Sequence, residues 1–219
     1  MNSPFLLWYK PLLNANIFAR TKRIKYESAF NRRYGMEQGA ENYRRFLDGD
    51  DTGLRALIEQ FSDGLILYLN TYTHDLTVAE EVMEDVFVKL AVRQPRYTGK
   101  ASFKTWLYTI ARHQAVDTLR RQARRHTVPL ETHGDLSDEA LLDQRMFIAE
   151  SKAQLHRALQ SLPDSYRQIL WLIYFEDMTA AEAGKVMGKN TRAAQSLLFR
   201  ARQALKTQLE KDGFVYEDI

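Results

Sequence analysis

The stretch Phe103–Arg125 constrains the fold more than any other, because its apolar residues do not fit on one side of a helix. It contains neither Gly nor Pro, so nothing in it interrupts helical structure. At 100° per residue the apolar residues divide between two sides: Phe103, Trp106, Leu107 and Ile110 on one, and Tyr108, Ala115 and Leu119 well round from them. Such a helix must be buried from two directions. We therefore expect it to be the central helix of an all-α domain.

The same stretch follows a flexible Gly-Lys-Ala-Ser turn at 99–102 and ends in a cluster of arginines. Aromatic rings can stack on unpaired bases, and Arg neutralises phosphates, so this mixture suits contact with nucleic acid. A core helix with a solvated charged end would have the same composition. The residues of this stretch alone leave both interpretations open.

Helical spacing also dominates the rest of the chain from residue 41, and we find no alternating pattern typical of strands. The pattern lapses at 126–150, which is rich in acidic residues and predicts a linker. We therefore expect an all-α protein of two small helical domains, 40–125 and 151–211, followed by a tail at 212–219. Residues 1–39 read as a basic extension, or as residues ahead of a natural start at Met36.

Short motifs predict where several helices begin. Asp50 or Asp51 is placed to cap one helix, and Asn190 or Thr191 to cap the last. Thr77 with Glu80, and Thr179 with Glu182, have the spacing of a capping box.

An acidic face is predicted on the helix that starts near residue 77. Its acidic residues share one side, opposite an apolar stripe: Glu80, Glu81, Glu84 and Asp85. Because these charges repel one another, the face is favoured only when water or a basic partner covers it. A di-metal carboxylate site would need Glu-x-x-His pairs, and the chain has none.

A helix-turn-helix is predicted at 179–206, where a short helix ends at Gly188 and a long one follows. The inward face of the long helix is apolar: Ala194, Leu197, Leu198, Ala201 and Leu205. Its outer face mixes side chains that read bases with side chains that bind phosphates. Ordinary helical hairpins have the same shape, so the polar face is what favours DNA binding.

Other function classes find little support. The chain has no Cys, and its five His residues show no spacing of a metal site or catalytic triad, so we expect no metal, no cofactor and no enzyme activity. The apolar run at 5–9 is too short to span a bilayer, and no basic residue precedes it. We expect no membrane insertion and a cytoplasmic location.

Four segments, in this order and spacing, resemble the extracytoplasmic-function group of bacterial sigma-70-type sigma factors. They are AEEVMEDVFVKL at 79–90, FKTWLYTIARHQAVDTLRR at 103–121, LPDSYRQIL at 162–170 and TRAAQSLLFRAR at 191–202. The resemblance covers residues 41–211. It implies an RNA polymerase sigma factor that binds core polymerase, recognises the −10 and −35 promoter elements and opens the promoter. The domains would be sigma region 2 and sigma region 4.

The resemblance also implies roles for individual residues. Polymerase binding, to the β′ clamp helices, would fall to Glu80, Glu81, Glu84 and Asp85. Contact with the −10 element, including capture of a flipped base, would fall to Arg96, Lys100, Ser102, Lys104, Arg112, His113, Asp117, Arg120 and Arg121. Contact with the −35 element would fall to Thr191, Arg192, Gln195, Ser196, Phe199, Arg200 and Arg202. Implied partners are core RNA polymerase, including its β flap, promoter DNA and an anti-sigma factor.

Two rivals come from other classes of protein. An autonomous helix-turn-helix regulator with an N-terminal sensing domain would bind duplex DNA without polymerase and would not use the acidic face. In a helical adaptor, the basic faces would merely be solvated.

Overall fold

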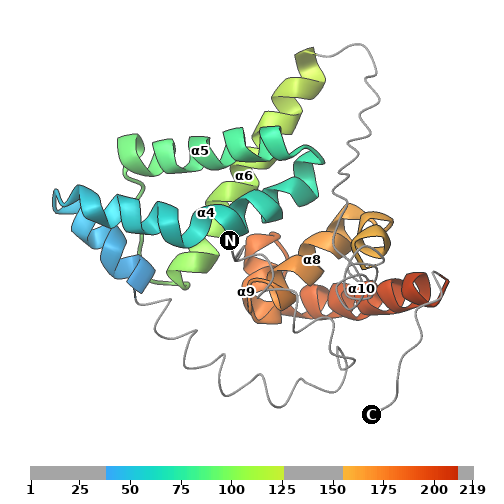
Figure 1. Cartoon of the computed structure of the whole chain (residues 1–219). Helices are drawn as coiled ribbons and strands as arrows, with labels where there is room; N and C mark the ends of the chain where they lie inside the picture. Colours follow the sequence, from blue (N-terminus) through green and yellow to red (C-terminus); the bar gives the residue numbers. More distant parts are fainter. Residues whose placement is uncertain (1–37, 126–154, 212–219) are drawn as a thin grey trace, which may run out of the picture.

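The computed structural model describes residues 38–125 and 155–211, and within these ranges the chain is helical and contains no strand (Figure 1). A helix over 38–47 precedes α4 (Asp51–Thr73), α5 (Leu76–Arg93) and α6 (Phe103–Arg125). A short helix over 155–160 precedes α8 (Asp164–Tyr174), α9 (Ala180–Val186) and α10 (Thr191–Lys211). The all-α prediction is confirmed. The linker predicted at 126–150, the tail at 212–219 and residues 1–37 of the extension lie outside the described residues.

The first helix already includes residues 38 and 39, so the domain start expected at residue 40 falls inside it. Gly39 lies against the core, where an added Cβ would meet the ring of Phe103 at 2.7 Å. The last two residues of the expected extension are therefore part of the folded unit.

Local capping rules account for the starts of several helices. The Asp50 carboxylate accepts a hydrogen bond from the backbone N–H of Thr52 (3.0 Å) and caps α4, as predicted. The capping box predicted at Thr77 is wrong. Asp75 caps α5 instead, because its carboxylate accepts from the N–H groups of both Thr77 (2.8 Å) and Val78 (3.2 Å), which leaves Thr77 inside the helix.

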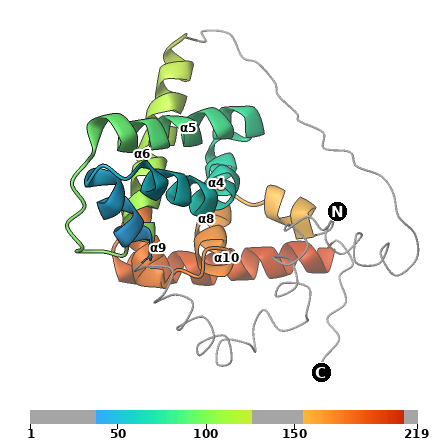
Figure 2. The ribbon, with the colours of Figure 1, turned by 60° about the vertical axis from the view of Figure 1, so that its left-hand side comes forward.

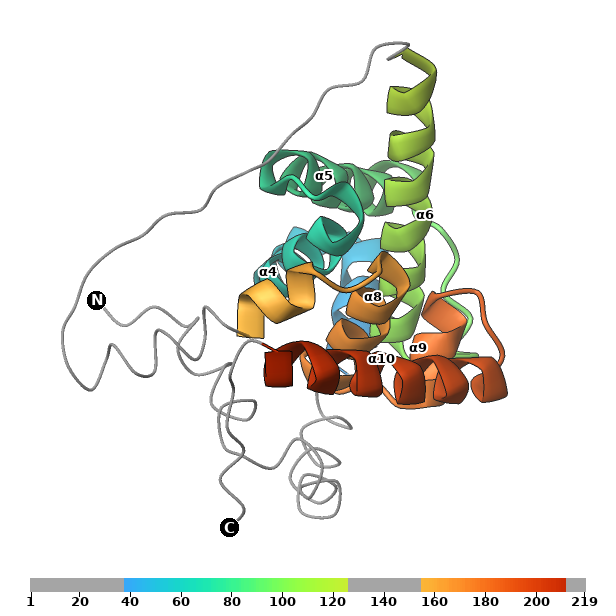
Figure 3. The same cartoon turned by 90° about the vertical axis from the view of Figure 1, so that its right-hand side faces the viewer.

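Helix α6 crosses α4 and α5, which cover one of its sides, while α9 packs on another side near its start (Figure 3). Phe103, Leu107, Tyr108, Ala111 and Ala115 are all buried, which confirms that α6 is buried from two directions. Its other half continues beyond the packed helices, at the top of Figure 1.

The second group of helices is α8, α9 and α10, which pack on one another. The capping box of Thr179 and Glu182 is present at the start of α9, as predicted. The Asn190 side-chain oxygen accepts from the N–H of Ala193 (2.8 Å) at the start of α10. The five apolar residues expected on the inward face of α10 are all buried.

The two groups lie directly against each other, through α6 with α9 and α4 with α8. Helix α10 runs along the outside of the second group, with its start beside α9 (Figure 2). The arrangement therefore brings the start of α6 close to the helix-turn-helix.

Candidate nucleic-acid interface

The predicted acidic face lies on the outer side of α5. Glu80, Glu81, Glu84 and Asp85 are all exposed, whereas the opposite side of α5 is buried in the core. The side-chain amide of Gln114 on α6 donates to the Asp85 carboxylate (3.0 Å), which orients one of the four. Two exposed valines, Val88 (57% exposed) and Val92 (77%), extend this face along the helix. The surface suits a partner with basic groups beside apolar ones.

The loop between α5 and α6 presents exposed Arg96 and Lys100 on a fixed frame. The Tyr97 hydroxyl donates to the carbonyl of Ala101 (2.7 Å), and its ring packs edge-on against Phe103 with the centroids 5.5 Å apart. Tyrosine is protonated at neutral pH, so the hydroxyl can donate this bond, and partial burial raises the pKa of Tyr97 further. Tyr97 thus anchors the loop to the core, while Arg96 and Lys100 remain exposed to solvent.

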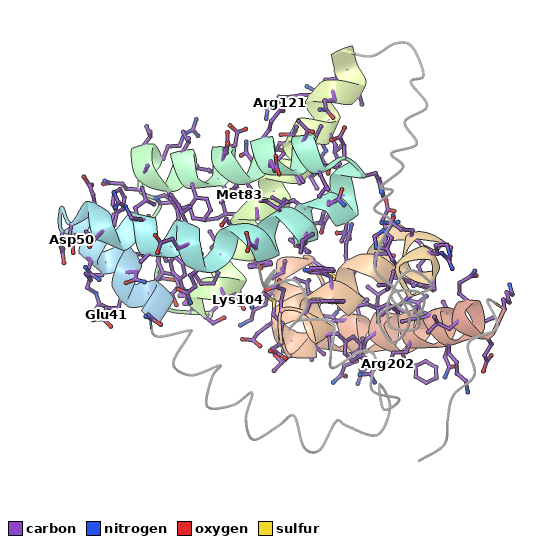
Figure 4. All side chains as sticks on the ribbon, viewed as in Figure 1. Glu41, Asp50, Met83, Lys104, Arg121 and Arg202 are labelled. Atoms are coloured by element: carbon purple, nitrogen blue, oxygen red, sulfur yellow. The ribbon has the colours of Figure 1, made fainter. Side chains whose placement is uncertain are left out.

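Along α6 the predicted residues divide into two kinds. His113, Asp117, Arg120 and Arg121 are exposed, and Arg121 lies on the half that leaves the core (Figure 4). Ser102, Lys104 and Arg112 are half-buried. Lys104, also labelled in Figure 4, points toward the second group of helices, where its Nζ lies 2.6 Å from a carboxylate oxygen of Glu176.

On α10 nearly all predicted residues share the outer face. Thr191, Arg192, Gln195, Ser196, Phe199 and Arg200 are exposed, and the ring of Phe199 is 64% exposed and therefore not packed against a neighbouring helix. Arg202 is the exception. Its guanidinium carbon lies 5.5 Å from the centre of the Tyr174 ring on α8, and its Nε is buried, so Arg202 packs α10 against α8.

Sequence reasoning missed the residues that join the two groups of helices. Glu176 is only 7% exposed, and the one signal in the sequence is an acidic pair, Glu176 and Asp177, within an otherwise apolar run. His74 and Asp164 also meet across the groups, with 3.4 Å between Nε2 and Oδ1. No local pattern marks these two.

Within the described ranges, no cluster of His, Asp and Glu is placed to hold a metal ion. In the same ranges, no helix has the length and apolar character needed to cross a bilayer.

Comparisons with known proteins support the assignment of both halves. Residues 57–125 match the family model for sigma-70 region 2, and residues 152–205 match the model for sigma-70 region 4. Together the two matches cover more than half of the chain.

Curated relatives align over most of their own length. The chain is 26% identical to RNA polymerase sigma factor YlaC of Bacillus subtilis over 157 residues, 71% of this chain and 91% of the relative. It is 27% identical to the ECF RNA polymerase sigma factor SigM of the same species, over 68% of this chain and 91% of the relative. It is 28% identical to the RNA polymerase sigma-H factor of Pseudomonas aeruginosa, over 80% and 95%.

Solved structures share the fold at 20% identity. The sigma factor RpoE of Bartonella quintana, in complex with the anti-sigma factor NepR, has a TM-score of 0.56 and covers 71% of this chain and 96% of its own. CnrH in complex with the cytosolic domain of CnrY has a TM-score of 0.54 and covers 81% and 97%.

Proposed function

The chain belongs to the extracytoplasmic-function group of the sigma-70 family of RNA polymerase sigma factors, and we propose that it uses α5 to bind core polymerase and α6 and α10 to bind promoter DNA. The observation that carries this proposal is the match to both sigma regions on one chain, in which the acidic face of α5 and the outer face of α10 are exposed. The site residues are proposals at the level of the individual side chain.

Core polymerase binding falls to the acidic face of α5. Four carboxylates on one exposed helical face form a strongly negative surface, and a basic partner would relieve their mutual repulsion. The clamp helices of the β′ subunit are the partner that we propose for this face. The β flap is the contact proposed for the second group of helices.

The loop at 96–102 and α6 bind the −10 element in this proposal. Arg96 and Lys100 are exposed beside a turn that Tyr97 holds in place, which suits the capture of a flipped base and its phosphates. The exposed arginines Arg120 and Arg121 follow on the projecting half of α6. These groups would hold the strand that separates as the promoter opens.

The exposed face of α10 binds the −35 element in this proposal, with the helix lying in the major groove. Gln195 has the side chain that pairs with adenine through two hydrogen bonds, and Arg192 and Arg200 can bind phosphates or guanine. Phe199 offers an exposed ring for a thymine methyl group. Arg202 is left out of this surface because it packs against Tyr174.

The protein adds no catalytic step of its own in this proposal; it positions the polymerase, which carries out the chemistry. We place its action in the cytoplasm, with the polymerase and the chromosome. An anti-sigma factor is a further proposed partner, since the similar solved structure of RpoE is a complex with an anti-sigma factor.

Reconstitution with core polymerase tests the proposal. The full chain is expected to direct run-off transcription from a promoter with −10 and −35 elements. A double variant, Glu81→Lys with Asp85→Lys, should weaken core binding at least about tenfold, because several favourable charge pairs become repulsive.

The matched control reverses an exposed acid pair of the same spacing on α4, Glu59→Lys with Asp63→Lys. This control should keep core binding. If the α5 variant also keeps it, the polymerase assignment is wrong, and tight footprinting of duplex DNA by the free chain would favour the autonomous regulator.

A further inference from the structure

The loop between α5 and α6 is fixed near both of its ends by tyrosine hydroxyls. Near its start, the backbone carbonyl of Pro95 accepts a hydrogen bond from the hydroxyl of Tyr43 on the first helix (2.8 Å). Near its end, the carbonyl of Ala101 accepts one from the hydroxyl of Tyr97 (2.7 Å). Two side chains thus satisfy carbonyls that a surface loop would otherwise leave to water.

The positions of both hydroxyls are set by the same two rings at the start of α6. The centroid of the Tyr43 ring lies 5.6 Å from that of Phe103 and 5.3 Å from that of Trp106. The corresponding distances for the Tyr97 ring are 5.5 Å and 5.3 Å. Tyr43 and Phe103 are both buried. The two fixed points of the loop therefore rest on one aromatic cluster in the core of the first group of helices.

Between the two fixed carbonyls, the loop is open to solvent. Gly99 has a positive φ of 72°, and a Cβ added to it would meet nothing within 4 Å. The side chains of Arg96, Thr98 and Lys100 are all exposed. The segment that can meet a ligand is therefore 96–100, with both of its flanks held in place.

Fixed flanks reduce the entropy that the loop loses on binding. A flexible loop loses backbone freedom when it closes on a ligand, and this loss weakens the affinity. A loop whose flanks are already in place loses less. A flipped base is a demanding ligand, because unstacking and unpairing it already cost free energy. The two hydroxyl bonds should therefore matter for the step in which the promoter opens, rather than for recognition of duplex DNA.

One of the two hydroxyls comes from a helix outside the match to sigma-70 region 2, which begins at residue 57. The first helix, over 38–47, nevertheless fits tightly against α6, since a Cβ added to Gly39 would meet the ring of Phe103 at 2.7 Å. Gly39 and Tyr43 are four positions apart and share one buried face of this helix. The first helix and the loop are therefore built on the same part of the core.

We propose that Tyr43 and Tyr97 are positioning residues for base capture: their hydroxyls hold the two flanks of the loop, so that residues 96–100 meet the flipped base in a preformed conformation. This inference rests on the proposed function for its DNA partner. Neither tyrosine touches DNA in this arrangement. The first helix becomes a working part of the −10 site, because it supplies Tyr43.

Two variants remove the hydroxyls and keep the rings in the aromatic cluster: Tyr43→Phe and Tyr97→Phe. The matched control is Thr71→Val on α4. The buried Thr71 hydroxyl also donates to a backbone carbonyl, that of Tyr68 (2.6 Å). It lies in the last turn of α4, which leads into the start of α5, whereas the loop follows the end of α5. Urea denaturation measures how much stability each of the three variants loses.

Holoenzyme formed from the full chain and core polymerase provides two of the readouts. The fluorescence of 2-aminopurine in the −10 element follows promoter opening. Its dependence on holoenzyme concentration separates the half-saturating concentration, which reports binding of duplex DNA, from the maximal rate, which reports opening. The third readout is the mobility of the loop in the free chain. A dye on Thr98→Cys, which is specific because the chain has no Cys, reports it through fluorescence anisotropy.

Each tyrosine variant should lower the maximal opening rate about fivefold, the equivalent of one net hydrogen bond, and leave the half-saturating concentration unchanged. Both should also lower the anisotropy of the dye, whereas Thr71→Val should change none of the three readouts.

An unchanged opening rate in both tyrosine variants, or an equal loss of opening in Thr71→Val, would overturn the positioning role. Slower opening with unchanged dye anisotropy would also overturn it, because the hydroxyls would then act on DNA directly. Failure of the unmutated chain to open the promoter with core polymerase would overturn the proposed function instead.

Discussion

Asn190 acts at the scale of one residue, because it starts the helix that is proposed to read the −35 element. Its side-chain oxygen accepts from the N–H of Ala193 (2.8 Å), a group that otherwise has no partner within the helix. Asn190→Ala should lower the free energy of unfolding by about 1 kcal/mol, measured by urea denaturation. Asn190→Asp keeps an acceptor at this position and should restore most of the loss. Equal losses in both variants would contradict the capping role.

Tyr43 makes the stability of the first group of helices depend on alkaline pH. Its side chain is 1% exposed, and its hydroxyl donates to the carbonyl of Pro95 (2.8 Å). Burial raises the pKa of Tyr43 to about 12, above the ordinary value of 10.0. The folded chain therefore holds this proton more tightly than the unfolded chain does. Its contribution to stability is complete below pH 10 and is lost as the pH rises from there toward 12.

Tyr43→Phe should lower the free energy of unfolding at neutral pH by about 1 kcal/mol, because the hydrogen bond is lost. It should also reduce the loss of stability above pH 10, because one titrating group is gone. Urea denaturation at several alkaline pH values measures both effects. An alkaline loss of stability identical to that of the unmutated chain would show that Tyr43 does not titrate as described.

At the scale of the helix, two arginines on α10 have different roles although they lie only two positions apart. Arg200 is exposed on the outer face, whereas Arg202 packs on the ring of Tyr174. Arg200→Ala should reduce the dependence of log affinity for −35 DNA on log salt by about 0.9, the value for one phosphate contact. Arg202→Ala should leave that dependence unchanged and lower the free energy of unfolding by about 1 kcal/mol.

Salt titrations of DNA binding and urea denaturation of both variants provide the comparison. Each variant is the control for the other, because both remove one positive charge from the same helix. A reduced salt dependence of DNA affinity in Arg202→Ala would show that Arg202 contacts DNA.

Short-range rules predicted much of the helix-level structure correctly. The helical periods, the caps at Asp50 and Asn190 and the box at Thr179 depend on groups a few residues apart, which the sequence displays directly. The box predicted at Thr77 failed because a stronger competitor, Asp75, stands two residues earlier and satisfies two N–H groups at once. The inward face of α10 was also predicted correctly, but which way Arg202 turns depends on Tyr174, 28 positions earlier in the chain.

At the scale of the whole molecule, the contact between the two groups could not be predicted from periodicity. The sequence indicated two separate domains, and nothing in a helical pattern shows which solvent-facing side of one domain meets the other. Lys104 has the polar character expected of a DNA contact, yet its partner is Glu176, 72 residues away. The four acidic residues of α5, by contrast, are exposed as their period predicts, because none of the helices over 38–125 and 155–211 covers that face.

Permanganate modifies unpaired thymines, so permanganate footprinting can show whether this chain directs core polymerase to open a promoter. With core polymerase and a promoter carrying both elements, the chain should make thymines of the −10 region reactive, and Glu81→Lys with Asp85→Lys should abolish that reactivity. Reactive thymines in the presence of the double variant, or none with the unmutated chain although it binds the duplex, would contradict the claim.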